Sequence, residues 1–489
     1  MIKTILNGFQ KSYISEIVKQ NDFLEIIGCI YIEEKVEFNS KFDFFFERNA
    51  LRRGEYINFN SIAYDDKIVK QTSKYIFNAL TLFDRYDVNQ NITTNQRLDI
   101  IYKSVVFWIN KIQDNSIELI VSREIPHFAH EYCIYIAAKI TNTKILMFDY
   151  AEHFKRTLCI SSIENRLVPN INSSRENIIK SNKLLINLRK SHTEVSQNSE
   201  APKMSCFFSK WQPFKWLHYI AYDILSLLKH GPLSYSVISI LLTKNNNITK
   251  KAPIHISVRF YFFILRFKVI YLDFLYSKYS NDFNLSSIPE KKSIIYFANY
   301  QPERTTNPDG GSFSDMYNAV MLIKNGLPDD WKLIYKEHPH TFSPPFKNLF
   351  RGVLYRKASF YKQLKKEGVI LAPTQEDSFE LMKHSSAVCS INGTILFEAV
   401  ANGKNAIILG NFFTESLEGV HKITSSKELY EFINSGNIDR PIDENKLIKN
   451  MSSVFENSVE YLNLLNNIRS FNTVKYEVSI LMPYIKRNI

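Results

Sequence analysis

Residues 386–410 read SAVCSINGTILFEAVANGKNAIILG, and this stretch decides the fold class. The apolar runs at 386–391 and 405–410 have the length and composition of buried strands. Between them, residues 394–402 place apolar side chains on one helical face, and Gly403 follows as a stop signal. A strand, a helix and a second strand in such close succession predict a βαβ unit of a parallel sheet.

The same alternation of strands and helices occupies the chain before this unit. Strand-like runs recur at 293–298, 332–337 and 368–373. Residues 313–325 have the pattern of a helix, which Gly326 ends. Of the fourteen glycines only four precede residue 300, so the tight turns of short βα units concentrate in the later part of the chain. We therefore predict a doubly wound, parallel α/β domain over residues 290–443.

A second α/β pattern occupies the N-terminal part of the chain. The runs at 117–123 and 144–150 have strand composition and flank a helical pattern at 129–140, and residues 22–34 contain a further strand. No G-x-G-x-x-G follows any of these strands, so the dinucleotide fingerprint is absent. We predict a second Rossmann-like domain over residues 1–200.

The remaining parts of the chain are predicted to be helical. Residues 201–289 form a basic and aromatic linker, since 201–290 hold eleven Lys and Arg residues against four Asp and Glu. Two interpretations stay open: the solvated face of an interdomain linker, or a segment that lies on an anionic membrane surface. We expect no nucleic-acid partner, because no binding module is recognisable. Residues 444–489 are predicted to be helices that return to the N-terminal domain.

Composition is typical of a soluble globular protein, with 45% hydrophobic and 22% charged residues. The five cysteines are scattered and form no C-x-x-C pair, which indicates buried thiols rather than disulfides. The first residues lack the apolar region of a signal peptide, and charges interrupt the apolar run 260–276 before it reaches the roughly 18–20 residues of a membrane span. We expect a cytoplasmic protein, peripheral on the inner face of the cytoplasmic membrane if the basic segment binds lipid.

Polar side chains gather where the predicted strands of the later domain end. The first such stretch is YKEHPH, in which His338 can donate to a phosphate oxygen and Lys336 adds a positive charge. Ligands of open α/β sheets bind at the carboxyl ends of the strands, where these residues fall. An ordinary His-Pro turn, with His338 as a loop cap, is the alternative interpretation.

The second stretch is the turn SINGT, which begins at Ser390 and includes Asn392. The backbone amides of Gly393 and Thr394 open a helix, and with the helix dipole they form an anion site to which the hydroxyls of Ser390 and Thr394 add donors. Glu398 lies one turn further on, where its carboxylate can accept from a sugar hydroxyl. Ordinary helix capping and a solvated helix position are the alternatives.

Two further polar loops follow predicted strands. The loop ANYQPERTTNPDGGSFSDM contains Gln301 and Glu303, and a loop of this length at a strand end is usually functional or flexible. The loop APTQEDSFELMKHS places Asp377 or Ser378 as a helix cap at the same edge of the sheet, where its backbone is a candidate to hold a nucleobase. Since the chain contains neither D-x-D nor H-E-x-x-H, we expect no bound metal ion.

In the N-terminal domain, SREIPHFAHEY (122–132) lies at the end of the strand 117–121. A general base for chemistry on a ligand of the later domain is expected at such a strand end. The candidate catalytic residues are therefore Glu124, His127 and Glu131, and the choice among the three stays open.

Taken in order, YQPERTTNPDGG, YKEHPH, DSFELM and SINGTILFEAVANGK resemble bacterial capsular and surface polysaccharide biosynthesis proteins. The resemblance covers about residues 290–435 and reaches the N-terminal half in outline only. It implies a GT-B glycosyltransferase, with two Rossmann-like domains facing a cleft and the N-terminal domain on the acceptor side. The His-Pro element and the Ser/Thr turn are also similar to those of bacterial sialyltransferases and Kdo transferases. That similarity implies that His338, Ser390 and Thr394 hold the donor phosphate, with Glu398 on a donor hydroxyl.

These observations predict a glycosyltransferase that moves a sugar from a nucleotide-activated donor to a growing bacterial surface polysaccharide. The expected donor is a CMP-linked acidic sugar such as a nonulosonate or Kdo, with UDP- and GDP-sugars as alternatives. The expected acceptor is an oligosaccharide or lipid-linked glycan, and no cofactor besides the donor substrate is expected. Two other classes stay open: a nucleotide-sugar epimerase or hydrolase of the same fold, and a non-catalytic capsule-assembly factor.

Overall fold

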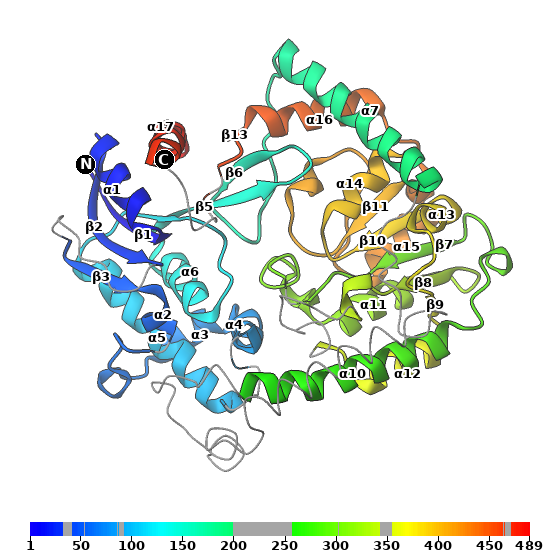
Figure 1. Cartoon of the computed structure of the whole chain (residues 1–489), viewed down its shortest axis with the longest axis horizontal. Coiled ribbons are helices and arrows are strands. Elements are labelled where there is room, and N and C mark those ends of the chain that lie inside the picture. The colour runs from blue at the N-terminus through cyan, green and yellow to red at the C-terminus, as the bar shows by residue number, and fades with distance from the viewer. Residues whose placement is uncertain are drawn as a thin grey trace. The chain divides into compact units, whose positions relative to one another are not determined.

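The structure is a computed structural model of the chain (Figure 1). It describes residues 1–32, 42–52, 54–85, 87, 92–198, 257–301, 303–342, 355–462, 464 and 471–489, and for 191–198, 257–267 and 471 the backbone alone. The described residues divide into two compact units. The first unit consists of 1–178 with 451–489, and the second of 179–198 with 257–450.

The first unit is built on a seven-stranded sheet in the order β13-β6-β5-β4-β1-β2-β3. Its strands are β1 (Ile2–Phe9), β2 (Leu24–Tyr31), β3 (Phe44–Glu47), β4 (Leu119–Ser122), β5 (Lys144–Ala151), β6 (Arg156–Ile160) and β13 (Ser458–Glu460). The strands β1 to β5 are parallel, whereas β6 and β13 are antiparallel to their neighbours. Within this order, β3 to β6 follow the 3-2-1-4-5-6 arrangement of dinucleotide-binding folds.

Helices cover both faces of this sheet. The helices α5 and α6 pack with apolar side chains on one face, and α1 and α17 pack on the other. Strands that are buried on both faces need near-continuous apolar sequence, which is why β4 reads LIVS. The helices of this unit are α1 (Lys11–Gln20), α2 (Arg48–Arg52), α3 (Asp66–Ser73), α4 (Ile76–Leu82), α5 (Thr94–Asp114), α6 (Ala129–Thr141) and α17 (Phe471–Asn488).

The second unit contains a six-stranded sheet in the order β12-β11-β10-β7-β8-β9, and every pairing is parallel. Its strands are β7 (Ser293–Phe297), β8 (Lys332–Lys336), β9 (Ile370–Ala372), β10 (Ala387–Ser390), β11 (Asn405–Ile408) and β12 (Val420–Lys422). Counted from β7, this is again the order 3-2-1-4-5-6. The chain order reverses between β7 and β10.

The helices of the second unit also lie on both faces of their sheet. The large apolar cluster on one face includes side chains of α10, α11, α12 and α15, while α13 and α14 pack against strands from the other side. These helices are α10 (Ser257–Ser280), α11 (Met316–Asn325), α12 (Ala358–Lys366), α13 (Ser378–His384), α14 (Thr394–Ala401) and α15 (Ser426–Asn434). The helices α7 (Arg175–Asn198) and α16 (Glu444–Glu456) each begin in one unit and end in the other.

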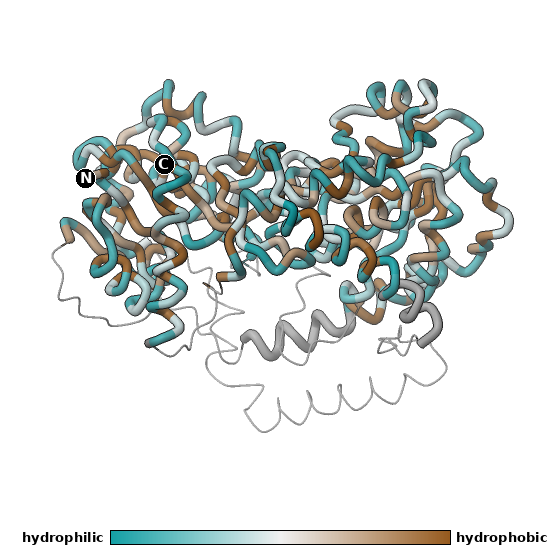
Figure 2. Tube along the Cα trace, turned by 90° about the horizontal axis from the view of Figure 1, so that it is seen from above, coloured by the Kyte–Doolittle hydropathy of each residue, from teal (hydrophilic) through white to brown (hydrophobic). Residues whose placement is uncertain are grey.

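The prediction of an α/β protein with two doubly wound, Rossmann-like halves is confirmed by these two sheets. Apolar residues lie mainly inside each unit along the trace in Figure 2, in agreement with the buried core. No helix in the described part of the chain has both the length and the apolarity of a membrane span.

Two local predictions were wrong. The helix predicted at 313–325 begins only at Met316, because the side chain of Asp315 accepts from the backbone amides of Tyr317 and Asn318 and so caps it there. The tail predicted as helices contains the strand β13, which pairs with β6. The division at residues 200, 289 and 443 stays a prediction, and the segment 201–256 lies outside the described residues.

Candidate functional site

The reversal of chain order between β7 and β10 is the place where open α/β sheets bind ligands. The strands β10, β7 and β8 are neighbours in the second unit, so the loops after their carboxyl ends meet at one edge of the sheet. Those loops carry most of the residues that the sequence singled out as binding residues.

The turn after β10 is held by side chains that point into the protein. The Ser390 hydroxyl lies 2.9 Å from both the Phe297 carbonyl oxygen and Asn299 Oδ1. The amide of Asn299 donates to the Asn392 carbonyl oxygen at 2.6 Å, and the amide of Asn392 donates to the Thr305 carbonyl oxygen. Ser390 and Asn392 are 1% and 0% exposed. Ser390 and Asn392 stabilise the turn through these contacts, and their contact with the nucleotide-sugar stays a prediction.

This turn presents the N-terminus of α14 without a side-chain cap. Gly393 precedes the helix at φ +118°, a conformation that side-chain-bearing residues rarely adopt, and among the described residues no side chain bonds to the first amides of α14. In the same unit α11, α13 and α15 are capped by Asp315, Asp377 and Ser425, whereas α12, like α14, has no side-chain cap. The hydroxyl of Thr394 makes no hydrogen bond among the described residues. An uncapped helix start with a positive dipole end is an anion-binding element.

His338 lies in the loop after β8 and has a defined tautomer. Its Nδ1 accepts from the His340 backbone amide at 3.2 Å, so the ring proton is on Nε2, for which the described residues provide no partner. Burial and the neighbouring His340 lower the pKa of His338 to about 4. The ring of Tyr300 lies 5.6 Å from that of His338. At neutral pH His338 is therefore an uncharged donor through Nε2–H.

A buried ion pair between Arg356 and Glu337 stabilises the loop that contains His338. Arg356 Nε and Nη2 donate to the two oxygens of Glu337 at 2.7 and 3.0 Å, and both side chains are at most 1% exposed. The hydroxyls of Tyr335 and Tyr361 each donate to Glu337 at 2.8 Å. Glu337 in turn accepts the backbone N–H of His338 at 3.0 Å. Arg356 was missed in the sequence because no local pattern links it to a partner nineteen positions away.

The structure brings Lys336 and Ser378 together, as two of the predicted binding residues. Lys336 Nζ donates to the Ser378 hydroxyl at 2.6 Å and to the Glu376 carbonyl oxygen at 2.7 Å. Burial lowers the pKa of Lys336 to about 8. The helix cap predicted for this loop is Asp377, whose carboxylate accepts from the first amides of α13.

The three remaining predicted binding residues have different surroundings. Gln301 is buried, donates to the Ser314 carbonyl oxygen at 2.8 Å and accepts from Arg356. Glu303 is exposed, and its carboxylate accepts from the Thr305 hydroxyl at 3.3 Å. Glu398 is half-buried in the second turn of α14. Of these three, Gln301 links the loop after β7 to Arg356 through hydrogen bonds.

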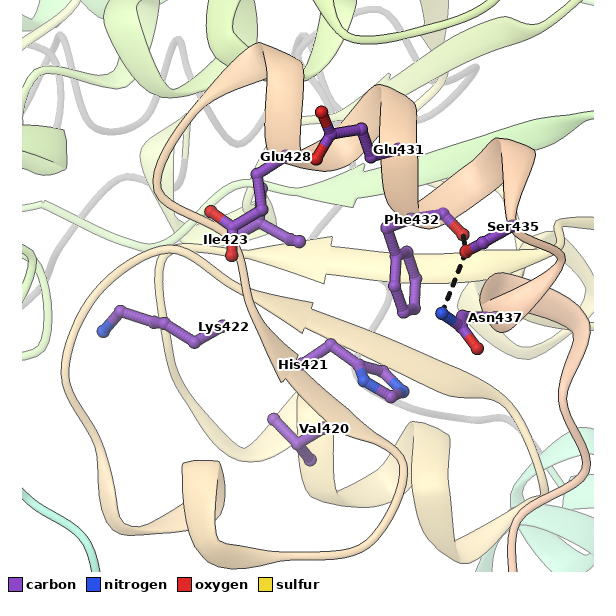
Figure 3. Close-up of a pocket in the computed structure, with 9 residues that line it drawn as sticks. All are labelled: Val420, His421, Lys422, Ile423, Glu428, Glu431, Phe432, Ser435 and Asn437. Carbon is purple, nitrogen blue, oxygen red and sulfur yellow. Dashed lines mark hydrogen bonds between the residues drawn. The ribbon is translucent and has the colours of Figure 1, made fainter.

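A separate surface pocket of about 490 Å³ lies at the edge of the same sheet, between the edge strand β12 and α15 (Figure 3). His421 lies against Phe432 with ring centres 4.6 Å apart, and Ser435 accepts from Asn437 at 2.8 Å. None of the predicted site residues lines it. Its position at an outer strand separates it from the loops after β7, β8 and β10.

The three candidate catalytic residues cluster in the first unit, where β4 ends and α6 begins. His127 Nδ1 lies 3.1 Å from a Glu124 oxygen, and the His127 backbone amide donates to Glu131 at 2.8 Å. Arg48 pairs with Glu124 at 3.0 Å and also donates to Glu131. No sequence pattern pointed to Arg48, because it lies in a different part of the chain from its partners.

Among the described residues no group of three or more His, Cys, Asp or Glu side chains is placed to hold a metal ion. The candidate hydrogen-bond donors at the second-unit site are the N-terminus of α14 and His338 Nε2.

Comparison with known proteins finds no matching family model and no matching curated protein. Similar solved structures include the S. aureus MnaA-UDP co-structure, at 12% identity over 100% of this chain and 96% of that one, with a TM-score of 0.22. UDP-GlcNAc 2-epimerase from Methanocaldococcus jannaschii is 10% identical over 93% and 99%, with a TM-score of 0.24. A glycosyltransferase from Rickettsia africae is 11% identical over the whole of both chains, also with a TM-score of 0.24. Structural similarity with such low identities and TM-scores gives no information about the activity of this chain.

Proposed function

We propose that this chain is a glycosyltransferase that uses a nucleotide-activated sugar, and that the donor phosphate binds between His338 and the N-terminus of α14. The observation that carries the proposal is the uncapped start of α14 at the reversal of strand order. The strand β7 separates β8 from β10, so these two strands lie about 10 Å apart at ordinary strand spacing, and His338 and the start of α14 follow their carboxyl ends. One extended nucleotide-sugar can reach both.

The chemical character of the site favours an anionic ligand that brings no metal ion with it. His338 is a neutral Nε2–H donor, and the α14 amides supply a positive dipole end. A CMP-linked acidic sugar is the leading donor class in this proposal, because CMP leaves with a single phosphate that protein donors alone can stabilise. UDP- and GDP-sugars are the other donor classes, and a surface polysaccharide is the proposed destination of the sugar.

The proposal is tested by isothermal titration calorimetry of the full chain with CMP, UDP and GDP. One nucleotide should bind, and its dissociation constant should rise when His338 is replaced. Incubation of the matching nucleotide-sugar with and without a glycan acceptor then separates the activity classes. Donor consumption that requires acceptor supports a transferase, whereas consumption without acceptor supports an epimerase or hydrolase. The absence of binding for all three nucleotides would leave a non-catalytic assembly factor.

A further inference from the structure

We propose that Lys336 and Ser378 form a further anion-binding element of the second unit. In it, the Ser378 hydroxyl donates to an anionic oxygen of the nucleotide-sugar, and the Lys336 ammonium supplies the positive charge behind that hydroxyl. This inference rests on the proposed function and deepens it, because it adds a full positive charge to a site that otherwise consists of a neutral imidazole and a helix dipole. Both residues belong to the second unit.

Lys336 lies on the same face of the sheet as the start of α14. It is the last residue of β8, at the carboxyl edge of the sheet. Tyr335, the residue before it, packs into the apolar cluster that includes side chains of α10, α11, α12 and α15. Because successive side chains of a strand point to opposite faces, Lys336 points to the face on which α13 and α14 pack. Its contact with Ser378, the first residue of α13, agrees with this direction.

The ammonium of Lys336 is a buried charge with uncharged acceptors. The residue is 6% exposed, and Nζ donates to the Glu376 carbonyl oxygen at 2.7 Å and to the Ser378 hydroxyl at 2.6 Å. Among the described residues no carboxylate forms an ion pair with Lys336, whereas the buried Arg356 of the same unit pairs with Glu337. A buried charge without a counter-ion is costly. An anion bound beside Lys336 would supply that counter-ion.

The Ser378 hydroxyl is the part of this element that a ligand can contact. It accepts from Lys336 Nζ, so its own proton is left to donate, and the described residues provide no acceptor for that proton. Ser378 is half-buried, whereas Lys336 is buried, so the hydroxyl is the more accessible of the two groups. A hydrogen bond from a cation makes the hydroxyl a stronger donor, because linked hydrogen bonds polarise one another. The ligand contact therefore belongs to Ser378 and the charge to Lys336.

An anion at this place would change the protonation of Lys336. Burial lowers the pKa of Lys336 to about 8, and the carboxylates of Asp377 and Glu376, from the loop before α13, oppose this. An anion at Ser378 favours the charged lysine and moves its pKa back toward the ordinary value. Between these two values binding takes up a proton, so the affinity falls as the pH rises. His338, with a pKa of about 4, stays neutral over this range.

The first test is isothermal titration calorimetry of the full chain with CMP, UDP and GDP, in buffers whose different ionisation enthalpies report proton uptake. If the anion restores the ordinary lysine pKa, binding takes up about 0.7 proton at pH 8.5 and about 0.1 at pH 7, and the affinity falls about fourfold between them. The nucleotide phosphate, whose own pKa is about 6, contributes little at pH 8.5. Lys336→Arg should bind without proton uptake, because a guanidinium keeps its charge, and Lys336→Met should bind more weakly at pH 7.

Lys404 is the matched control. Its Nζ also donates to two uncharged acceptors, the carbonyl oxygens of Lys383 and Ser385 at 2.7 and 2.6 Å, and burial also lowers its pKa. It precedes β11, however, and so lies at the opposite edge of the sheet. Lys404→Met should therefore leave nucleotide binding and proton uptake unchanged.

The outcomes identify the anion and separate the two proposals. Uptake with a free nucleotide assigns the anion to the phosphate, and uptake only with a nucleotide-linked acidic sugar assigns it to the sugar carboxylate. Binding without uptake in either case, or uptake that persists in Lys336→Arg, overturns the role of Lys336 and leaves the proposed function intact.

The second test decides the case in which no nucleotide binds, which refutes the proposed function. Lysine labelled with ¹³C in the full chain, with Lys336→Arg to identify the signal, reports the titration midpoint of Lys336 by NMR. In saturating inorganic phosphate this midpoint should rise in the wild type and stay low in Ser378→Ala. A midpoint that is the same with and without phosphate overturns the anion-binding element.

Discussion

Glu337 and His338 are adjacent in the chain, yet their side chains differ in their hydrogen-bond partners. Glu337 accepts from Arg356, Tyr335 and Tyr361, whereas His338 Nε2–H has no hydrogen-bond partner among the described residues. The lowered pKa of His338 keeps the ring neutral at physiological pH. In the proposed function, Glu337 would therefore support the loop and His338 would bind the ligand.

Replacement of His338 by Ala is expected to weaken nucleotide binding about tenfold to a hundredfold, because one hydrogen bond to a charged phosphate is lost. Calorimetry with the nucleotide that binds the wild-type chain measures the change. The matched control is His384→Ala, because His384 bonds the Ile288 carbonyl oxygen away from the proposed site. An unchanged dissociation constant in His338→Ala, with normal circular dichroism, contradicts the assignment.

Replacement of Arg356 by Met is expected to lower the free energy of unfolding by about 3–5 kcal/mol, because it leaves Glu337 buried without its cation. Burial raises the pKa of Glu337, but Arg356 and the tyrosine hydroxyls hold it below its usual value. The stabilisation is therefore complete above the carboxyl's ordinary pKa and is lost as the pH falls through the lowered folded value. Urea denaturation at several pH values measures this. Wild type and variant should differ less in acid than at pH 7.

At the scale of secondary-structure elements, α14 combines two demands that only Gly393 meets. Its start turns at a positive φ after β10, and Gly393 has no side chain that could cap its first amides. Gly403 also adopts a positive φ, +76°, and it follows the other end of the same helix with nothing within 4 Å of an added Cβ. Both glycines therefore adopt a positive φ, but only Gly393 lies at the end of α14 where the phosphate is proposed to bind.

Gly393→Ala and Gly403→Ala are both expected to lower the free energy of unfolding by roughly 1–3 kcal/mol, through backbone strain. Only Gly393→Ala should also weaken nucleotide binding, because it moves the amides at the start of α14. Thermal unfolding and calorimetry on both variants separate the two effects. Equal loss of nucleotide binding in both would show that strain, and not the anion site, is responsible.

At the scale of the whole molecule, the proposed chemistry uses protein donors for the phosphate charge. Turnover is therefore expected to persist in EDTA at the rate seen without chelator. This expectation rests on the absence of D-x-D from the sequence and on the hydrogen-bond donors after β8 and at the start of α14. A rate that falls in chelator and returns with Mg²⁺ or Mn²⁺ would mean that a divalent ion carries the phosphate.

The basic segment 201–289 leads to the prediction that the whole molecule binds to anionic membranes. The part of α10 whose side chains are described exposes Tyr271 and Phe274, at 52% and 45%. Binding to vesicles that contain anionic lipid is expected at low salt and should weaken as salt rises. Co-sedimentation of the wild type and of a variant with Arg259, Arg266 and Lys268 changed to Gln measures it. Equal sedimentation of the two decides for a solvated linker.

The sequence by itself determined the α/β class, because apolar strand runs and helical faces are local patterns. It located the βαβ unit at 386–410 and the polar loops at its strand ends for the same reason. It placed Glu124, His127 and Glu131 in one short stretch, and the fold brings all three together at the end of β4.

The contacts of each of these residues depend on the tertiary structure, because burial and partners involve segments far apart in the chain. Ser390 and Asn392 lie inside the turn, where they contact Phe297, Asn299 and Thr305. The pairing of Glu337 with Arg356 and of Glu131 with Arg48 joins residues that no spacing rule connects. The tautomer of His338 follows from a single backbone contact, and that contact exists only once the chain is folded.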